Sequence, residues 1–139
     1  MALLSPSHAA RTVRVGIYEN PPKIFHDATG RASGIQIDLL REIAAAESWQ
    51  LEFISCQWQD CLDRITAGQL DLLPDVAHTE ARGLQFDFHH TPALHSWSQI
   101  YRRADVSIQS LLDLDGRRIA MLAGSVQESA LRQMLAGFD

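Results

Sequence analysis

The sequence predicts an α/β fold in which strands alternate with helices around a mostly parallel sheet. Three observations carry this prediction: a β-branched run at residues 13–18, an amphipathic segment at residues 37–48 and a second apolar run at residues 51–55. A helix between two strands is the usual crossover of a parallel pair, because a short turn cannot connect parallel strands. We therefore expect a three-layer α/β/α lobe whose ligands gather beyond the carboxyl ends of its strands.

The first part of the lobe reads as a strand, a loop and a helix. Residues 13–18 (VRVGIY) predict the strand by their alternation, and residues 19–34, rich in Pro and Gly, predict the loop. Residues 37–48 predict a helix because apolar residues recur on one face at helical spacing. Those residues are Ile37, Leu40, Ile43 and Ala44.

The next part repeats this order. Residues 51–55 (LEFIS) predict the second strand, and residues 58–68 predict a short helix that stops at Gly68. Residues 71–76 form a compact apolar run broken by Pro74. Since Pro cannot donate to a sheet ladder, this run predicts a buried third strand that ends at a pocket.

The pattern changes after the third strand. Residues 93–103 (ALHSWSQIYRR) predict an extended segment. Residues 110–116 predict a capped turn, residues 117–124 (RRIAMLAG) a strand and residues 125–138 a helix.

Arg82 is the first candidate for a binding residue. Thr79 is expected to cap a helical turn that places Arg82 at its third position. A guanidinium there is suited to a small anion, because its two parallel N–H groups match a carboxylate. The alternative is a solvated surface Arg, or one that pairs with Glu80 or Asp87.

The composition is that of a globular protein, with 46% hydrophobic and 21% charged residues. A net charge of −5 and the absence of a Lys/Arg cluster argue against nucleic acid as a partner. No apolar run approaches the length of a membrane span. We expect no cofactor and no metal: there is no Gly-rich phosphate loop, and the spacing of His89, His90 and His95 fits no zinc pattern.

Two features bear on the cellular compartment. Residues 1–12 read as the remnant of a secretory leader, with a small-residue cleavage site at residues 7–9, or as an unstructured start introduced in cloning. Cys56 and Cys61 would bridge in an oxidising compartment if their Cα atoms come within about 7 Å. Free or buried thiols are the interpretation that we favour, because Cys is among the residue types most often buried.

A dozen short motifs over residues 13–135 occur in an order typical of one family. The positions concerned are Gly34, Leu40, Trp58, Gly68, Asp71, Thr79, Arg82, Phe86, Asp87, Phe88, Asp113, Leu114, Gly116, Ile119, Ala120, Gly124 and Ser125. In these motifs the chain resembles the periplasmic solute-binding proteins of family 3, the polar amino-acid type. Residues 72–82 and 95–103 resemble the versions fused to bacterial sensor histidine kinases.

The resemblance implies a two-lobe clamp of the periplasmic-binding-protein type. Lobe 1 would span residues 13–92, a hinge strand residues 93–103, and an incomplete lobe 2 residues 104–139, since the family's clamp needs a longer chain. Such a truncated lobe exposes the apolar edge of residues 118–122, so we expect homo-oligomers or strand exchange with another copy.

The resemblance also implies ligand-binding residues: Tyr18, Trp58, Asp75, Arg82 and Ser125. Tyr18 ends the first strand, and Trp58 forms an aromatic wall or, alternatively, fills the core. Asp75 receives a ligand ammonium or pairs with Arg82. The turn at Ser125 would offer its hydroxyl and backbone N–H groups to a ligand carboxylate.

An ordinary helix cap also explains the Ser125 turn. Ser125 and Glu128 form an S-x-x-E capping box, which by itself accounts for both residues. The next position, often Thr or Ser in amino-acid binders, is Val126 in this chain, and this departure puts an ordinary amino-acid ligand in doubt.

Three functions remain open. The first is extracytoplasmic binding of a small anionic or amino-acid-like solute by the sensor module of a fused or partner membrane signalling protein, which places the chain in the periplasm. The second is a free substrate-binding receptor of an ABC transporter. The third is an enzyme on the same scaffold, dehydratase-like or peptidoglycan-cleaving; a lone carboxylate at Asp75 supports it weakly, and we expect no enzymatic activity.

Overall fold

A computed structural model describes residues 10–137, so the predicted cleavage site at residues 7–9 lies outside the described range. The chain divides into two compact units, Met1–Ala77 and His78–Asp139. We call them the first and the second unit and describe each by itself. None of the helices in the described range is long and apolar enough to cross a membrane.

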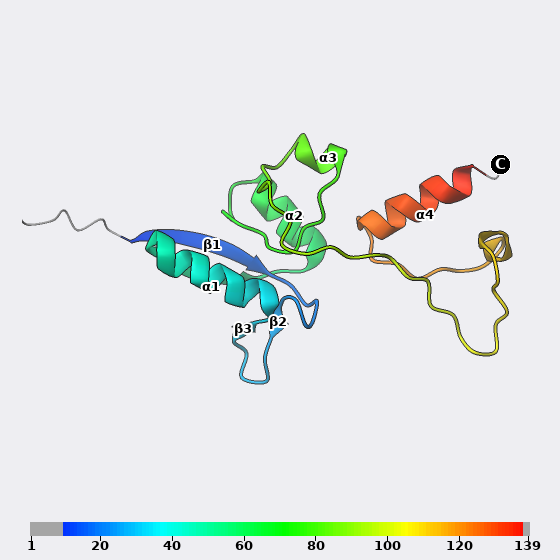
Figure 1. The fold of residues 1–139 in the computed structure, drawn as a ribbon, viewed down its shortest axis with the longest axis horizontal. Helices are drawn as coiled ribbons and strands as arrows, with labels where there is room; N and C mark the ends of the chain where they lie inside the picture. Colours follow the sequence, from blue (N-terminus) through cyan, green and yellow to red (C-terminus); the bar gives the residue numbers. More distant parts are fainter. Residues whose placement is uncertain (1–9, 138–139) are drawn as a thin grey trace, which may run out of the picture. The chain divides into compact units, whose positions relative to one another are not determined.

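The first unit is built on two parallel strands, the first of which is drawn in blue in Figure 1. Strand β1 (Arg11–Ile17) pairs with β4 (Trp49–Ser55), with Val13 opposite Leu51. The predicted parallel pairing is thus confirmed. The crossover contains a small hairpin, β2 (Phe25–His26) and β3 (Ala32–Ser33), and helix α1 (Ile35–Glu47).

Helix α1 starts at a glycine that no other residue could replace without strain. Gly34 has a φ of 115°, and a Cβ atom built on it would lie 2.5 Å from the carbonyl oxygen of Lys23. Ile37, Leu40 and Ala44 are buried as predicted, but Ile43 is 40% exposed. The prediction for Ile43 was wrong because six residues after Ile37 a helix has turned well away from the same face.

The predicted third strand is reduced to a single parallel bridge. Leu72 bridges Val15, and its carbonyl accepts a hydrogen bond from Gly16 N–H at 3.0 Å. Pro74 follows two residues later and cannot extend the ladder. Asp71 anchors this segment, since its carboxylate accepts from the backbone N–H and the guanidinium of Arg14 at 2.8–2.9 Å.

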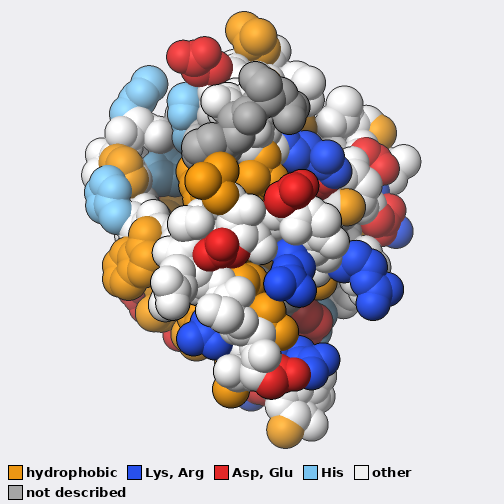
Figure 2. All heavy atoms as spheres, turned by 90° about the vertical axis from the view of Figure 1, so that its right-hand side faces the viewer, with side chains coloured by type: hydrophobic (Ala, Val, Ile, Leu, Met, Phe, Trp, Pro, Cys, Tyr) orange, Lys and Arg blue, Asp and Glu red, His pale blue; other side chains and the backbone are white. Residues whose placement is uncertain are grey.

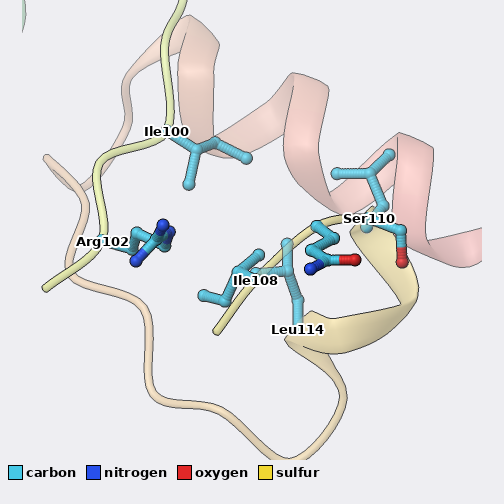
Figure 3. A pocket seen from close by; sticks show the side chains of 7 residues that line it. Ile100, Arg102, Ile108, Ser110 and Leu114 are labelled. Carbon is cyan, nitrogen blue, oxygen red and sulfur yellow. The ribbon is translucent and has the colours of Figure 1, made fainter. Parts of the chain in front are cut away.

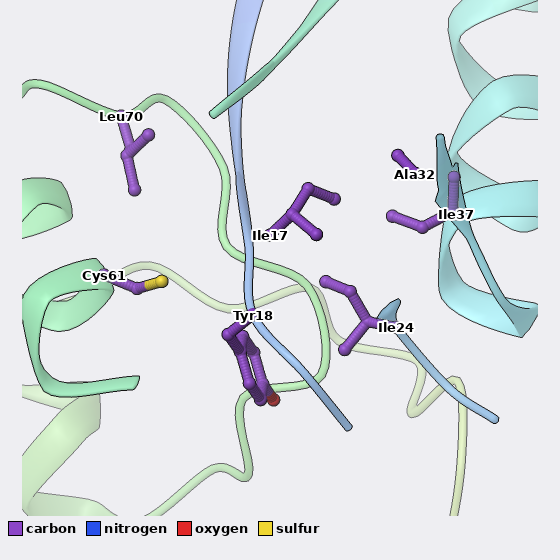
Figure 4. Packing of buried hydrophobic residues seen from close by; sticks show 7 residues of the cluster. All are labelled: Ile17, Tyr18, Ile24, Ala32, Ile37, Cys61 and Leu70. Carbon is purple, nitrogen blue, oxygen red and sulfur yellow. The ribbon is translucent and has the colours of Figure 1, made fainter. Parts of the chain in front are cut away.

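The core of the first unit lies on both faces of β1 (Figure 4). Ile17, Ile24 and Ile37 are fully buried on the side of α1. Cys61, from helix α2 (Trp58–Thr66), is fully buried on the opposite side together with Leu70. This part of the chain therefore forms the expected three-layer arrangement of helix, sheet and helix.

Cys56 and Cys61 form a disulfide with their Cα atoms 5.3 Å apart. The interpretation of these residues as free or buried thiols was therefore wrong. It rested on how often Cys is buried, and Cys61 is fully buried even so. The end of β4 and the first turns of α2 come close enough to join because only two residues separate the two elements.

The second unit contains little regular structure. Its elements are α3 (Glu80–Gly83), a 3₁₀ turn η1 (Leu111–Leu114) and α4 (Val126–Ala136). Residues 93–103, predicted as an extended hinge strand, form neither a helix nor a strand. The strand predicted at residues 117–124 is not formed, because a strand needs a ladder partner and the described part of this unit holds none.

Apolar side chains of the second unit remain on its surface. Leu84 is 89% exposed and Trp97 86%. Ile119, Met121 and Leu122, from the segment predicted as a strand, are also exposed. Hydrophobic side chains, drawn in orange, stand among charged ones on the face shown in Figure 2.

Candidate functional site

A hollow of about 490 Å³ lies in the first unit, where β1 and β4 end. Both strands are parallel, so their carboxyl ends meet at one edge of the sheet, which is where α/β proteins bind ligands. The residues that line the hollow are Ile17, Tyr18, Glu19, His26, Ser55, Cys56, Gln57 and Asp60.

Tyr18 and Trp58 meet beside this hollow. Their rings pack edge to face, with centroids 5.1 Å apart and an interplanar angle of 63°. Tyr18 is 7% exposed and belongs to the core, while Trp58 packs against that core from the start of α2. The structure thus brings two of the predicted site residues into contact, and both also fill space in the interior.

Asp75 is the centre of a polar network at the same end of β1. Its carboxylate lies 2.7 Å from Lys23 Nζ and accepts a hydrogen bond from Asn20 Nδ2 at 2.8 Å. The Tyr18 hydroxyl donates to the backbone carbonyl of Asp75 at 3.1 Å and to its carboxylate at 3.2 Å. Asp75 has a φ of 60°, a left-handed conformation that Asp tolerates better than most residues.

Sequence reasoning missed Lys23 and Asn20 as partners of Asp75. It considered a ligand ammonium or Arg82 as the cation, whereas the structure supplies Lys23 from the loop after β1. The signal that could have found them is the polar residues on either side of Pro21 and Pro22, in a loop that follows a strand directly.

A second polar chain crosses the hollow. His26 Nδ1 lies 2.6 Å from Glu19 Oε1, and the backbone N–H of His26 donates to the same oxygen at 3.2 Å. Ser55 Oγ lies 3.0 Å from His26 Nε2. These contacts link the loop after β1, strand β2 and the end of β4. Sequence analysis had not singled out any of the three residues.

Arg82 is positioned by a capped turn in the second unit. Thr79 Oγ1 accepts a hydrogen bond from the backbone N–H of Arg82 at 3.2 Å, which confirms the predicted N-cap. The Arg82 guanidinium contacts a residue much later in the sequence: its Nη2 donates to the carbonyl of Gly124 at 3.0 Å. Arg82 and the turn before α4 are therefore neighbours.

Ser125 caps helix α4, as predicted. Its buried hydroxyl accepts from the backbone N–H of Glu128 at 3.2 Å, and Glu128 Oε2 accepts from Gly124 N–H at 2.9 Å. Hydrogen bonds from Arg132 and from Gly124 N–H hold the pKa of Glu128 below its usual value. In this structure the turn's hydroxyl and one of its N–H groups thus serve the helix cap.

Another hollow, of about 420 Å³, lies in the second unit (Figure 3). Ile100, Ile108 and Leu114 give it a mainly aliphatic lining. Arg102 is its only charged lining residue, and its Nη1 donates to the carbonyl of Val106 at 2.8 Å. Among residues 10–137, no group of three or more His, Cys, Asp and Glu side chains is placed to hold a metal ion.

The family model of the bacterial extracellular solute-binding proteins, family 3, matches residues 13–135 of this chain. The chain belongs to this family. The resemblance seen in the short motifs is thereby confirmed over nearly the whole described range.

Two relatives of family 3 illustrate the match. A probable amino-acid ABC transporter-binding protein of Haemophilus influenzae is 29% identical over 105 residues, which are 75% of this chain and 41% of that protein. An amino-acid-binding protein of Dichelobacter nodosus is 28% identical over 116 residues, which are 81% of this chain and 45% of that protein. The chain thus spans about half the length of the relatives it matches.

Solved structures agree on the fold. An ancestral arginine-binding protein bound to glutamine matches with a TM-score of 0.72 and 28% identity, over 94% of this chain and 59% of that one. A histidine kinase sensor domain with similarity to periplasmic binding proteins matches with a TM-score of 0.74 and 28% identity, over 94% and 57%. The predicted periplasmic-binding-protein fold is confirmed by these neighbours.

The family 3 site residues predicted from sequence fall into two groups. Tyr18, Trp58 and Asp75 lie together in the first unit. Arg82 and Ser125 lie near each other in the second, since the Arg82 guanidinium contacts the residue that precedes Ser125. Each group combines residues far apart in the sequence, as a binding site requires.

Proposed function

We propose that this family 3 protein binds a small solute that carries a carboxylate, and that it does so as the sensor module of a signal-transduction protein. The observation that carries the binding role is the Arg82 guanidinium, held by a Thr79-capped turn beside the Gly124 carbonyl. A guanidinium fixed at both its backbone and its tip loses little entropy when it receives a carboxylate.

An amino-acid-like solute fits the relatives best. Two similar proteins are named for amino-acid binding, and a similar ancestral structure holds glutamine. In this proposal Arg82 receives the ligand carboxylate and the Ser125 turn contributes an N–H or hydroxyl donor. The Val126 side chain next to it makes a hydroxyl contact impossible at that position, so Arg82 carries more of the affinity.

Tyr18 and Trp58 are proposed to contact the apolar part of the ligand. Tyr18 lines the hollow of the first unit and is held by its edge-to-face contact with Trp58, and a rigid aromatic ring binds at low entropic cost.

Asp75 is proposed to accept the ligand ammonium. Its carboxylate already lies against Lys23 and orients the Tyr18 hydroxyl, so the ammonium would have to replace or share the Lys23 contact. Asp75→Asn should therefore weaken binding of amino acids more than binding of carboxylic acids that lack the ammonium.

The similarity to a histidine kinase sensor domain supports the sensor role, and the similarity to an ABC transporter-binding protein supports a transport receptor as the second candidate. Deletion of the gene separates the two. A sensor predicts that the transcriptional response to the solute is lost while uptake of the labelled solute continues. A transport receptor predicts loss of uptake.

The compartment follows from the same proposal. The Cys56–Cys61 disulfide is of a kind that persists in oxidising compartments and is rare in the cytosol. Together with membership of an extracellular solute-binding family, it supports a periplasmic location. Alkylation with a membrane-impermeant thiol reagent in intact cells, after mild reduction, should modify Cys56, which is only partly buried; protection of Cys56 until lysis would contradict this location.

Calorimetric titration of the full-length protein tests the binding role. The panel contains the twenty amino acids and small dicarboxylates. We expect saturable binding of at least one member in the micromolar range and a rise in melting temperature with the same compound. Absence of any binding at millimolar concentrations, for a protein that melts cooperatively, would refute the proposal.

A further inference from the structure

The hollow of the first unit has walls that accept hydrogen bonds. Its polar lining residues include two carboxylates, Glu19 and Asp60, together with Ser55 and Gln57, and no Lys or Arg lines it. His26 also lines it, and Gln57 can both donate and accept. The two charged lining groups are carboxylates, which only accept, so the hollow is complementary to a cationic donor.

The hydrogen-bond directions along the Glu19–His26–Ser55 chain reinforce this character. Glu19 Oε1 can only accept, so His26 Nδ1, at 2.6 Å, carries the proton. Ser55 Oγ lies 3.0 Å from His26 Nε2, within hydrogen-bond distance, and the direction of this hydrogen bond follows the tautomer of the ring. Ser55 lines the hollow, and its oxygen can accept a hydrogen bond from a ligand donor.

Both carboxylates remain accessible. The Glu19 side chain is 60% exposed and that of Asp60 44%. Asp60 Oδ1 accepts from Arg64 Nε at 2.9 Å, one helical turn further along α2, and Arg64 itself is not part of the lining. Tyr18 also lines the hollow, beside the apolar Ile17.

We infer that this hollow receives a cationic side chain, and that the solute is a basic amino acid whose guanidinium or ammonium group binds Glu19, Ser55 and Asp60. The inference rests on the proposed function, namely that the chain binds an amino acid. It adds the class of that amino acid, which neither the family nor Arg82 decides.

Other side chains fit this lining less well. An acidic side chain would face two carboxylates, and like charges in one hollow repel. An apolar side chain would remove water from Glu19 and Asp60 without replacing its hydrogen bonds, which is costly for charged acceptors. Neutral amides satisfy some acceptors, and Gln57 can donate to their carbonyl, but they bring no positive charge to Glu19 and Asp60.

Two pairs of near-isosteric ligands test the inference. Arginine and citrulline have nearly the same shape but differ in charge. Lysine and norleucine share a four-carbon side chain, and only lysine carries the terminal ammonium. Calorimetric titration of the full-length protein should show arginine or lysine bound at least tenfold more tightly than its neutral counterpart. Glu19→Gln should reduce that ratio severalfold while citrulline or norleucine affinity changes little.

The matched control is Glu47→Gln, which removes one negative charge from the exposed end of α1, outside the hollow, and should leave the ratio unchanged. If Glu19→Gln does not fold, Asp60→Asn takes its place. Equal affinities within a pair, tighter binding of a neutral or acidic amino acid, or an unchanged ratio in both hollow variants would overturn the inference and leave the proposed function standing. Absence of binding by every amino acid would overturn both.

Discussion

The two units of this chain contain similar apolar runs and use them differently. In the first unit, β1 finds a parallel partner in β4, and Ile17, Ile24 and Ile37 become fully buried. In the second unit, the run at residues 117–124 has no partner among the described residues and its apolar side chains remain exposed. Apolar patterning alone therefore does not make a strand; a ladder partner is also needed.

Truncation of one apolar side chain in each unit should change the free energy of unfolding by very different amounts, and this is the largest effect that we expect. Ile17→Ala removes a fully buried side chain from the centre of the first unit and should lower the free energy of unfolding by about 2–5 kcal/mol. Leu84→Ala removes a side chain that is 89% exposed in the second unit, and its effect should stay within about 0.5 kcal/mol. Urea unfolding monitored by circular dichroism measures both.

Equal destabilisation by the two substitutions would contradict the difference in burial between the two units. It would mean that Leu84 is covered in solution, by another copy or by another part of the protein. Sedimentation velocity at several concentrations identifies self-association, which remains a prediction.

Loss of the disulfide should have the next largest effect on stability. The Cys56–Cys61 bond closes a short loop between β4 and α2, and the chain-entropy argument assigns such a loop about 2 kcal/mol. The double variant Cys56→Ala/Cys61→Ala should melt at a lower temperature than the oxidised protein, and a reductant should no longer change its melting temperature. A variant as stable as the oxidised protein would show that β4 and α2 are held by packing alone.

The smallest expected effect is the pH-dependent change in melting temperature on substitution of Asp71. Hydrogen bonds from the Arg14 side chain and backbone lower the pKa of Asp71 below its usual value. A carboxyl with a lowered folded-state pKa adds stability above its unfolded-state pKa of about 3.9, and this stability is lost as the pH falls further. Asp71→Asn should lower the melting temperature at pH 7 by a few degrees and by less at pH 3.

The control for this prediction is Asp38→Asn, which alters a single exposed contact with Arg41 on α1. Its effect should be near zero at both pH values, since isolated exposed ion pairs contribute little. An Asp71→Asn effect that is the same at pH 3 and pH 7 would show that packing, and not the Arg14 pairing, is responsible.

Much of the first unit could be predicted from the sequence because its signals are local. The alternation at residues 13–18 and the helical spacing in α1 each involve residues within one element, and the Thr79 cap of the second unit is local in the same way. The predictions that failed depend on partners far away in the sequence. Pro74 shortened the third strand to one bridge, and the missing partner left residues 117–124 irregular.

The candidate site divides in the same way. Residue type and position at element ends identified Tyr18, Trp58 and Arg82, whose local placements the structure bears out. The pairing of Lys23 with Asp75 and the Glu19–His26–Ser55 contacts were missed, because the residues involved are up to 52 positions apart and meet only after β1 and β4 pair.

Titration of the Arg82→Ala variant tests the central claim most directly, namely that the chain holds a solute carboxylate through this guanidinium. A charge-assisted bidentate contact contributes about 1.5–3 kcal/mol, so the substitution should weaken binding about ten- to a hundredfold. Arg82→Lys should also weaken binding, because the fork is lost, whereas Arg102→Ala in the same unit should not. Thermal melts without ligand show whether each variant is folded. Unchanged solute affinity in a folded Arg82→Ala variant would contradict the account.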